Sequence, residues 1–349
     1  MQNHSSTGVV CVSNAATQAP FDASKSSEKT SPAFLDRFKT KPRALIAGTV
    51  TAACGLILAL ALGTAVAQVQ PTQESTGARS KTLLAAHAEL TDRLTNNVYG
   101  RPLFIESTES KTTVSGDAYA ILDSSFRAVN SAFKNPGQWC EVMILHINTK
   151  YCRASTQLTP SILNVNIGKK TPQELSDTFA LQFGMKLAST SADYLSIQLN
   201  SDQGPVGTSN YRIEFEATPL GVGKTFMHLR YSYGYGVAGR LAMQGYLATL
   251  GSGKVGFTSS DPGKNSAFVG GMRGAVERNT MRYYLAIEAY LASQNKPEPQ
   301  QLDSRFEHWF DATERYQLQL HEVEKSAYLM MKKAEHQRQQ QVAVAPGKG

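Results

Sequence analysis

Hydrophobic and polar residues alternate along four segments in the middle of the chain, and this period of two predicts β-strands with one buried face. In the fourth segment, every second residue from Met227 to Tyr235 is apolar or aromatic, whereas His228 and Arg230 lie between them. The connections between the last three segments are short and rich in glycine, proline or aspartate, so these strands are expected to pair antiparallel. The four segments are 178–188, 193–200, 209–217 and 225–235.

Three shorter strand-like segments precede these four and bring the predicted total to seven. They are 112–122, 151–156 and 162–168. A short helix is predicted after the first of them, because residues 123–125 offer side-chain oxygens that can cap its N-terminus. Pro136 and Gly137 are expected to stop this helix. Its apolar stripe consists of Phe126, Val129 and Phe133.

Helical spacing of apolar residues predicts three longer helices. The first covers 81–95 and the second covers 274–293, and Pro297 and Pro299 separate the second from the third. In the third, apolar residues recur at alternating spacings of four and three, which is typical of a coiled-coil seam. This helix either packs across its own domain or pairs with a second copy or a partner helix. Its seam consists of Leu302, Phe306, Trp309, Thr313, Tyr316, Leu320, Val323, Ala327 and Met330.

A run of 23 residues without charge, 44–66, lies near the N-terminus. At about 1.5 Å per helical residue it is long enough to cross the ~30 Å hydrocarbon layer of a bilayer. Basic residues before it would keep the leader, 1–43, in the cytoplasm, and the rest of the chain would be exported to the periplasmic side. Small residues at its end allow signal cleavage between Ala67 and Gln68. The run is therefore either a cleaved export signal or an uncleaved anchor in the inner membrane.

Cys140 and Cys152 are the two cysteines that follow this run. In an oxidising compartment such a pair favours a disulfide bond. The bond requires Cα atoms within about 7 Å, whereas a straight strand would hold them ~40 Å apart. A disulfide therefore requires a helix over 141–145 or a turn near 146–149. Two buried free thiols are the alternative.

The net charge of +7 resides largely in the two ends of the chain. Basic residues are not gathered with exposed aromatic residues into one patch, which argues against nucleic-acid binding. Gly234–Gly239 matches a dinucleotide-binding spacing, but it follows antiparallel strands and no βαβ repeat comes after it. None of the seven histidines lies in the spacing of a His-Glu-x-x-His zinc motif. We therefore expect neither a cofactor nor a metal ion.

Tyrosines gather on the predicted dry face of two neighbouring strands. Tyr231 and Tyr233 lie on the last strand and Tyr211 lies on the strand before it. Trp139 and His146 lie at the corner between the short helix and the next strand. Such residues either fill a packed core or line an amphipathic ligand cavity, and the pattern alone allows both.

The order of these elements resembles the START-like, or polyketide-cyclase-like, superfamily, whose fold is called helix-grip. The sequence GDAYAILDSSFRAVNSAFKNPGQWCEV is similar to the first strand, the first helix and the later tryptophan of that superfamily. Over about 110–293, the resemblance implies an α+β fold: a curved, seven-stranded antiparallel sheet wraps round helix 274–293, with an apolar cavity between them. It implies no catalytic residues, because the enzymes and carriers of the superfamily share none. The residues expected to line the cavity are Trp139, His146, Tyr211, Tyr231, Tyr233 and Tyr283.

Three functions are compatible with these patterns. The first is an exported or membrane-tethered periplasmic protein that binds a hydrophobic small molecule or lipid in the cavity. The second is an interaction protein that pairs through 302–330. The third is a cyclase-like or hydrolase-like enzyme, which would need polar groups such as His146 and Arg230 to converge inside the cavity. Strand alternation, however, tends to place Arg230 on the wetter face.

The chain is expected to divide into six segments. They are a disordered leader (1–43), a transmembrane or signal segment (44–67), a linker and helix (68–109), a ligand-binding domain (110–293), a long amphipathic helix (294–337) and a disordered tail (338–349).

Overall fold

The computed structural model describes residues 75–344, apart from 156, 158–159, 250, 252 and 261–266. The predicted leader, the charge-free run and the predicted cleavage site lie outside these residues. The described residues all belong to one structural unit, 69–349. Among the helices described in this unit, none is long and apolar enough to cross a membrane.

Eight strands form a single antiparallel sheet, one strand more than the sequence predicted. Their order is β1-β2-β8-β7-β6-β5-β4-β3. The additional strand, β1 (Leu103–Glu109), lies in the segment that was expected to be linker and helix, and it pairs with β2 at one edge of the sheet. The others are β2 (Thr113–Leu122), β3 (Thr149–Ser155), β4 (Ser161–Ile167), β5 (Phe179–Thr190), β6 (Leu195–Gln203), β7 (Thr208–Pro219) and β8 (Thr225–Tyr235).

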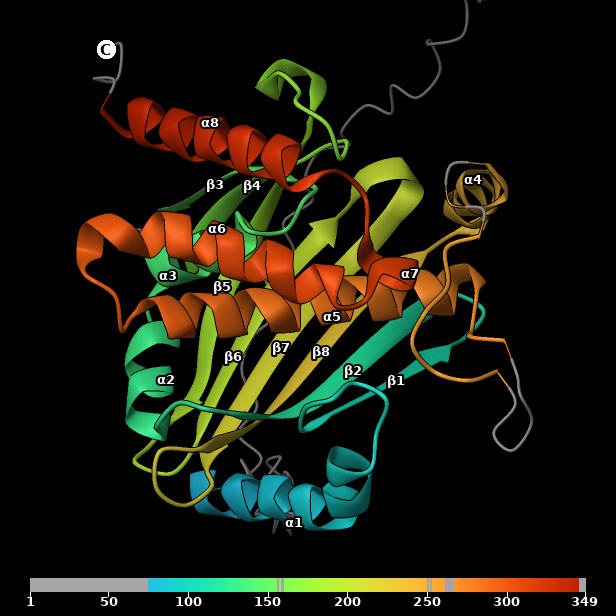
Figure 1. Cartoon of the computed structure of the whole chain (residues 1–349). Coiled ribbons are helices and arrows are strands. Elements are labelled where there is room, and N and C mark those ends of the chain that lie inside the picture. Colours follow the sequence, from blue (N-terminus) through green and yellow to red (C-terminus); the bar gives the residue numbers. More distant parts are fainter. Residues whose placement is uncertain are drawn as a thin grey trace, which may run out of the picture. The chain divides into compact units, whose positions relative to one another are not determined.

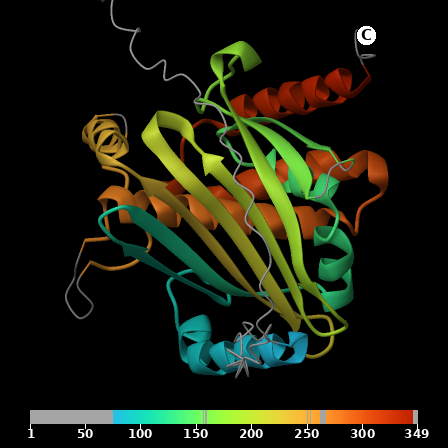
Figure 2. The same cartoon turned by 180° about the vertical axis from the view of Figure 1, so that it is seen from behind.

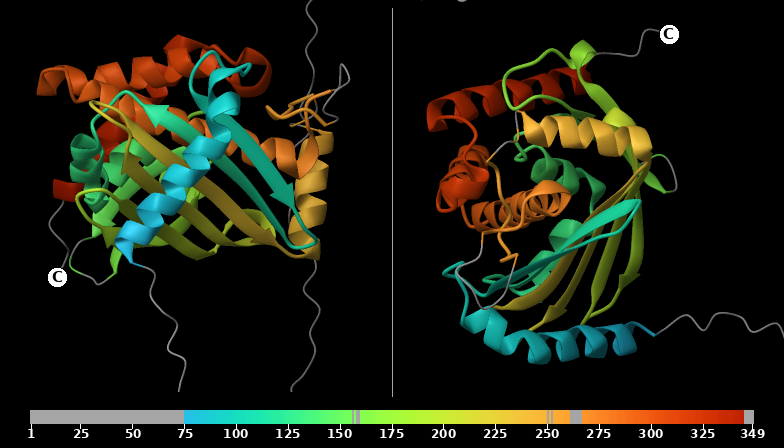
Figure 3. Two further views of the ribbon diagram at one scale, coloured as in Figure 1. Left: turned by 90° about the horizontal axis from the view of Figure 1, so that it is seen from below. Right: turned by 90° about the vertical axis from the view of Figure 1, so that its right-hand side faces the viewer.

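The sheet curves around α5 (Gly271–Ser293), which lies against its concave face (Figures 1 and 3). Gly116 of β2 permits the close approach of this helix, because a β-carbon at that position would lie 2.5 Å from Thr280 Oγ1. Helix α6 (Glu298–Glu314) packs along α5 as well, so α5 is buried along most of its length. This arrangement is the helix grip that the resemblance implied.

Two short helices connect β2 to β3. Helix α2 (Phe126–Phe133) begins after Ser125, whose Oγ accepts a hydrogen bond from the Ala128 amide, in agreement with the predicted cap. Pro136 does more than stop this helix: it begins α3 (Pro136–Met143), because the fixed φ of proline suits the first turn of a helix. Asn135 caps α3 by accepting a hydrogen bond from the Gly137 amide at 2.9 Å.

A disulfide bond joins Cys140 of α3 to Cys152 of β3, which confirms that prediction. The helix and the turn that follows it shorten the path between the two residues, and their Cα atoms lie 5.1 Å apart. The bond therefore fixes the α3–β3 corner, which carries His146.

Helix α1 (Thr76–Thr95) packs on the opposite, convex face of the sheet, which Figure 2 shows from behind. Its residues Leu83 and Leu94 join Phe226 of β8 and Tyr194 in a second, smaller core. Since Phe226 points to α1 while the next residue, Met227, belongs to the main core, β8 is buried on both faces near its start.

Two turns and a further helix complete the connections of the sheet. They are the 3₁₀ turns η1 (Leu175–Asp177) and η2 (Pro205–Gly207) and helix α4 (Val237–Ala248), which follows β8. A β-carbon on Gly239 of α4 would lie 2.5 Å from the carbonyl oxygen of Gly207. Close packing of α4 on η2 therefore accounts for a glycine in the 234–239 motif.

The single long helix predicted for 294–337 is divided into three. These are α6, α7 (Gln317–Leu320) and α8 (Lys325–Val344), so helix also extends into the predicted tail. Phe306 and Trp309 of the predicted seam are only 0% and 3% exposed, because they pack within their own domain. After the break the buried face shifts by one residue: Met330 is 70% exposed, whereas Tyr328 and Met331 are buried. The structure therefore corrects the prediction of one continuous pairing seam.

Helix α8 closes over β3 through a buried group of charges. Glu335 accepts hydrogen bonds from Lys150 Nζ at 3.0 Å and from Lys332 Nζ at 2.8 Å. Both lysines are fully buried. Burial lowers the pKa of Lys332 to about 8, although the charge of Glu335 opposes this shift. Lys332 also donates to the carbonyl oxygen of His146, so α8 and the disulfide bond hold the same corner.

Candidate functional site

Five of the six residues that were predicted to line a cavity meet between the concave face of the sheet and α5. We call them the tyrosine–histidine cluster: His146, Tyr211, Tyr231, Tyr233 and Tyr283. Each is at most 9% exposed. Ring centroids are 4.9 Å apart for His146 and Tyr283, 5.5 Å for Tyr231 and Tyr283, 6.1 Å for Tyr211 and Tyr231, and 5.3 Å for Tyr211 and Tyr233. A continuous series of ring contacts therefore joins β7 and β8 to α5 and to the α3–β3 corner.

Trp139 lies apart from the cluster. Its ring packs against Phe133 and Phe215 with centroids 5.3 and 5.9 Å away, and its Nε1 donates to the carbonyl oxygen of Phe133 at 2.7 Å. Phe215 lies on β7 between the β7–β8 hairpin and Tyr211. Trp139 is therefore part of an aromatic layer between the hairpin end of the sheet and the cluster.

The tyrosines of the cluster are protonated near neutral pH. Burial raises the pKa of each phenol, and the neighbouring tyrosines raise the pKa values of Tyr231, Tyr233 and Tyr283 further. The Tyr211 hydroxyl shares a 2.9 Å hydrogen bond with Thr208 Oγ1. The cluster thus combines aromatic faces, which suit an apolar ligand, with neutral hydroxyl groups, which can orient it.

His146 carries a buried hydrogen-bond donor. Its Nδ1 accepts a hydrogen bond from the Asn148 amide at 3.2 Å, which places the proton of the neutral ring on Nε2. Within the described part of the chain, Nε2 makes no hydrogen bond of ordinary geometry, although interaction with the nearby Asn279 side chain raises the pKa of the ring. Burial lowers the pKa of His146 well below its usual value, and the charges of Arg282 and Lys332 lower it further. The ring is therefore a neutral donor at physiological pH.

A path of polar groups leads from the cluster through α5. Asn279 affects the pKa values of both His146 and Tyr231, so its side chain lies beside both. Its Oδ1 accepts a hydrogen bond from Arg282 Nη1 at 3.3 Å. Arg282 Nη2 in turn donates to Glu322 Oε1 at 2.7 Å. The cluster is thereby connected to charges in the turn between α7 and α8.

Sequence reasoning missed Asn279 and Arg282. The two are three residues apart in the predicted helix 274–293, a spacing that places them on one face. What identifies their role is burial, because Arg282 is only 3% exposed and a buried guanidinium needs a partner. That partner, Glu322, lies 40 residues away along the chain, beyond the reach of a local pattern.

A second polar group lies on the convex face of the sheet. His228 Nε2 is 2.7 Å from Asp117 Oδ1, and Arg230 Nε donates to the same oxygen at 2.8 Å. His228 Nδ1 lies 3.5 Å from Glu216, which also accepts a hydrogen bond from the Tyr194 hydroxyl. Burial by itself would lower the pKa of His228, but hydrogen bonds to Asp117 and Glu216 raise it above its usual value. We call these five residues the convex-face network.

The convex-face network shows where Arg230 lies. Arg230 and His146 are on opposite faces of the sheet, so these two residues, named as an example of polar groups that an enzyme would bring together, do not converge. The two carboxylates of the network contact different nitrogens of His228. Among the described residues, no three His, Cys, Asp or Glu side chains are arranged to hold a metal ion.

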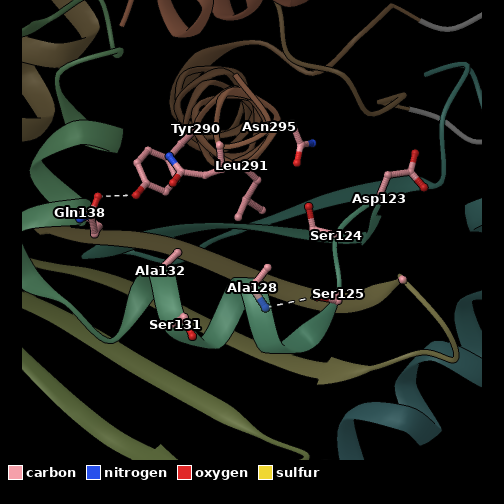
Figure 4. A pocket seen from close by; sticks show the side chains of 12 residues that line it. Asp123, Ser124, Ser125, Ala128, Ser131, Ala132, Gln138, Tyr290, Leu291 and Asn295 are labelled. Atoms are coloured by element: carbon pink, nitrogen blue, oxygen red, sulfur yellow. Dashed lines mark hydrogen bonds between the residues drawn. The ribbon is translucent and has the colours of Figure 1, made fainter. Parts of the chain in front are cut away.

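A cleft of about 530 Å³ opens between α2 and the last turns of α5 (Figure 4). Tyr290 and Leu291 form part of its wall, and the Tyr290 hydroxyl donates to Gln138 Oε1. We call it the α2–α5 cleft. None of the six predicted lining residues borders it. The cleft is lined by Asp123, Ser124, Ser125, Ala128, Ser131, Ala132, Gln138, Gly223, Tyr290, Leu291, Gln294 and Asn295.

Comparisons with known proteins give similarity to solved structures. No family model matches the chain, and neither does any curated protein. The human StAR-related lipid transfer protein 5 shares 10% identity over 62% of this chain and 99% of its own, with a TM-score of 0.33. A conserved protein from Geobacillus kaustophilus shares 11% identity over 52% of this chain and 96% of its own, with a TM-score of 0.31. Truncated norcoclaurine synthase from Thalictrum flavum shares 12% identity over 41% of this chain and 91% of its own, with a TM-score of 0.29.

Proposed function

We propose that the protein binds a hydrophobic small molecule or lipid between the concave face of the sheet and α5, in contact with the tyrosine–histidine cluster. The observation that carries this proposal is the buried Nε2–H of His146, which makes no hydrogen bond of ordinary geometry with the described residues and lies beside Tyr283. An unsatisfied buried donor costs about 1–3 kcal/mol. An acceptor atom of a ligand would satisfy this donor, while the aromatic faces contact its apolar part.

The energies of packing and binding are compatible with such a ligand. Because the rings of the cluster contact one another, the ligand has to separate some of them. Each aromatic pair contributes about 0.5–1.5 kcal/mol beyond its buried area. A ligand that buries roughly 300 Å² of apolar surface gains roughly 7 kcal/mol at about 25 cal/mol per Å². Burial of the ligand therefore offsets the loss of two or three ring contacts.

The α2–α5 cleft supports a route for entry. It borders α2 and the β7–β8 hairpin, so it opens at the hairpin end of the grip. The aromatic layer of Phe133, Trp139 and Phe215 stands between this end and the cluster. Displacement of α2 together with Phe133 would therefore connect the cleft to the cluster, and Trp139 would border the route of the ligand.

Native mass spectrometry tests ligand binding directly. The full-length protein, purified without detergent and exposed to a total lipid extract, is expected to carry a non-covalent adduct that denaturation releases. Replacement of the unpartnered donor in His146→Phe should lower occupancy at least tenfold, since the ring contacts persist but the donor is lost. His228→Phe, on the convex face, is the matched control and should retain the adduct. A wild-type protein that carries no adduct after this exposure would contradict the proposal.

We also propose that residues 68–349 act on the periplasmic side of the inner membrane, either anchored or released. The disulfide bond supports this setting, because structural disulfides are rare in reducing compartments. The charge-free run 44–66 supports it as well. An alkaline phosphatase domain fused after residue 75 should be active, and deletion of 44–66 should abolish that activity. Intact mass of the mature protein then distinguishes an anchor from cleavage after Ala67.

The other two functions lack a specific observation in their favour. The pairing seam is divided, and its aromatic residues Phe306 and Trp309 are buried within their own domain. His146 and Arg230, the example given of polar groups that an enzyme would bring together, are separated by the sheet. Ligand binding is therefore the function that we propose for the site.

A further inference from the structure

We infer that the η2 turn and the outer face of α4 bind the surface of a phospholipid bilayer, with aliphatic side chains entering the lipid and basic side chains meeting anionic head groups. This part of the protein lies at the end of the sheet away from α1 (Figures 1 and 3). The contact goes beyond the proposed function, because a bilayer can be bound here whether or not the tyrosine–histidine cluster holds a ligand. We call it the α4 surface, and it consists of Lys111, Val206, Val237, Arg240 and Leu241.

Three exposed aliphatic side chains are gathered on the α4 surface. Val206 is 70% exposed, Val237 is 79% exposed and Leu241 is 63% exposed. Val237 and Leu241 are four residues apart in α4, so they share one face of the helix. Val206 lies in η2, where a β-carbon on the next residue, Gly207, would lie only 3.1 Å from the nitrogen of Gly239 in α4. Single exposed aliphatic residues are common, whereas a group of them on neighbouring elements marks a contact surface.

The backbone conformation of Val206 shows that folding alone does not account for this residue. Its φ is 57° and its ψ is 39°, in the left-handed region, which is unfavourable for a residue with a branched β-carbon. Glycine would adopt these angles without strain. The turn therefore holds an aliphatic side chain in water at a conformational cost, and residues in such conformations are concentrated at functional sites.

The charges of the α4 surface complement anionic lipid. The guanidinium of Arg240 has uncharged partners: its Nη2 donates to the carbonyl oxygen of Lys111 at 2.9 Å, and it lies 5.5 Å from the ring centroid of Tyr235. This hydrogen bond keeps the β1–β2 turn, with the exposed side chain of Lys111, beside α4. The segment 217–260, which supplies α4, contains no aspartate or glutamate, and Glu109 approaches only through the Tyr235 hydroxyl, at 3.4 Å. Basic residues at such a position are attracted to anionic head groups.

The size of the aliphatic group favours a bilayer over a second copy of the chain or another protein. Three aliphatic side chains offer less than the ~800 Å² that each partner buries in a stable protein interface. Binding at a bilayer surface scales with the buried apolar area and with the attraction of basic residues to anionic lipid, and it needs no partner of matching shape. The residue that precedes η2, Gly204, is close to the tyrosine–histidine cluster, because a β-carbon on it would lie 2.1 Å from the ring of Tyr211. The α4 surface therefore borders the proposed ligand site.

Fluorescence quenching by brominated lipid tests the contact in the full-length protein. The variant Leu241→Trp is reconstituted with vesicles of phosphatidylethanolamine and phosphatidylglycerol. The emission of the added tryptophan should fall at least twofold when the acyl chains carry bromine, which quenches at short range. Met330→Trp is the matched control, because Met330 is also 70% exposed but lies on α8, and its added emission should be unchanged. The emission of the wild-type protein in the same vesicles is subtracted, since it reports Trp139 and Trp309.

Further changes in the Leu241→Trp protein test each part of the α4 surface. Replacement of phosphatidylglycerol by phosphatidylcholine should reduce the quenching at least twofold, and so should the added double substitution Lys111→Gln, Arg240→Gln. The added substitution Val206→Gly should also reduce it, while the urea midpoint stays unchanged or rises, because glycine relieves the left-handed conformation. A fall in the urea midpoint would mean that Val206 serves the fold and not the contact.

The possible outcomes separate this contact from ligand binding. Equal emission of Leu241→Trp in brominated and unbrominated vesicles overturns the inference, and so does equal quenching of Leu241→Trp and Met330→Trp. Dimers, detected by light scattering, that shield Leu241→Trp from brominated lipid also overturn it, because a second copy then covers the α4 surface. The proposed function is overturned only by an empty native mass spectrum after exposure to total lipid, so the two can fail separately.

Discussion

Two histidines lie on the two faces of the same sheet, and their surroundings give them opposite charge states. His146, on the concave side, is buried beside aromatic rings and near cations, so its pKa is lowered and its ring stays neutral. His228, on the convex side, contacts two carboxylates, so its pKa is raised and its charged form is favoured. The Nε2–H of His146 makes no hydrogen bond of ordinary geometry with the described residues, whereas each ring nitrogen of His228 lies near a carboxylate.

The contrast between the two histidines separates polar groups that stabilise the fold from polar groups that are candidates for ligand contact. A buried polar group whose hydrogen-bond partners are all present in the fold contributes to the stability of the protein, and this contribution is enough to explain its presence. The convex-face network is of this kind, because its charges balance across β2, β7 and β8. A buried polar group without a partner is not explained in this way, since folding would be more favourable without it. His146 is of the second kind, and its donor is therefore the better candidate for contact with a ligand.

Removal of the disulfide bond is expected to give the largest effect and to act on the concave side alone. The double variant Cys140→Ser, Cys152→Ser should lose about 3 kcal/mol of unfolding free energy, because the closed loop no longer restricts the unfolded chain. Urea denaturation measures this loss. The α3–β3 corner should also loosen, so ligand occupancy should fall, while the pKa of His228, followed by NMR, should remain unchanged. A change in the pKa of His228 in this variant would show that the two faces of the sheet are coupled.

His228→Phe should cost about 2 kcal/mol, because hydrogen bonds to charged groups contribute about 1.5–3 kcal/mol and two carboxylates lose their shared partner. Equilibrium unfolding in urea gives the value. Asp123→Asn is a suitable control, since Asp123 and Lys224 form an exposed pair that should contribute less than about 1 kcal/mol. Equal losses in the two variants would contradict the view that the convex-face network stabilises the fold.

The pH dependence of stability should have opposite signs for the two histidines. The folded-state pKa of His228 is raised, so its contribution is complete below about pH 6.5 and is lost as the pH rises through its folded pKa. The folded-state pKa of His146 is lowered, so stability is lost as the pH falls below about 6.5, where only the unfolded chain takes up the proton. Each pKa unit corresponds to about 1.4 kcal/mol.

Urea midpoints measured between pH 5 and pH 8 separate these contributions. The variant His146→Phe should flatten the acid side of the profile, and His228→Phe should flatten the alkaline side. Identical profiles in both variants would disprove the assignment of charge states.

His146→Phe should have the smallest effect on stability. The ring contact with Tyr283 is preserved, and removal of the poorly satisfied Nε2 donor offsets the loss of the hydrogen bond from the Asn148 amide to Nδ1, so the unfolding free energy should change by less than about 1 kcal/mol. Ligand occupancy should nevertheless fall, as proposed above. The same experiments report both quantities, and a loss of stability comparable to that of His228→Phe would mean that His146 is a structural residue.

Much of the sheet could be predicted because its strands have one dry face. Strands β5, β7 and β8 have 12, 12 and 11 residues, which is long enough for alternation of apolar and polar residues to identify each as a strand. Strand β1 escaped prediction because Leu103 and Ile105 are its only buried apolar residues, which are too few to show an alternation. The heptad pattern in 302–330 predicted the buried face of α6 correctly. A period of 3.5 residues cannot reveal that the helix is interrupted and that the next helix buries positions shifted by one residue.

The aromatic residues of the candidate site could be predicted from the sequence, but the polar contacts around them could not. Tyr231 and Tyr233 share a face by alternation, and the resemblance placed this face inside the grip. The partner of Arg282 and the missing partner of His146 depend on contacts between distant segments, which a local pattern does not contain. The hydrogen-bond partners of these two residues could therefore be identified only from the three-dimensional structure.

The pairing of Lys150 with Glu335 also bears on when the protein can finish folding. The two residues are 185 positions apart, so β3 is synthesised long before the carboxylate that it needs. A buried lysine without its counterion is strongly unfavourable, and Lys332, which shares the carboxylate, arrives equally late. The full burial of Lys150 in β3 therefore depends on α8, because only this helix supplies Glu335. We expect the α3–β3 corner to complete its packing only when α8 has docked, although the disulfide bond itself joins residues that are only 12 positions apart.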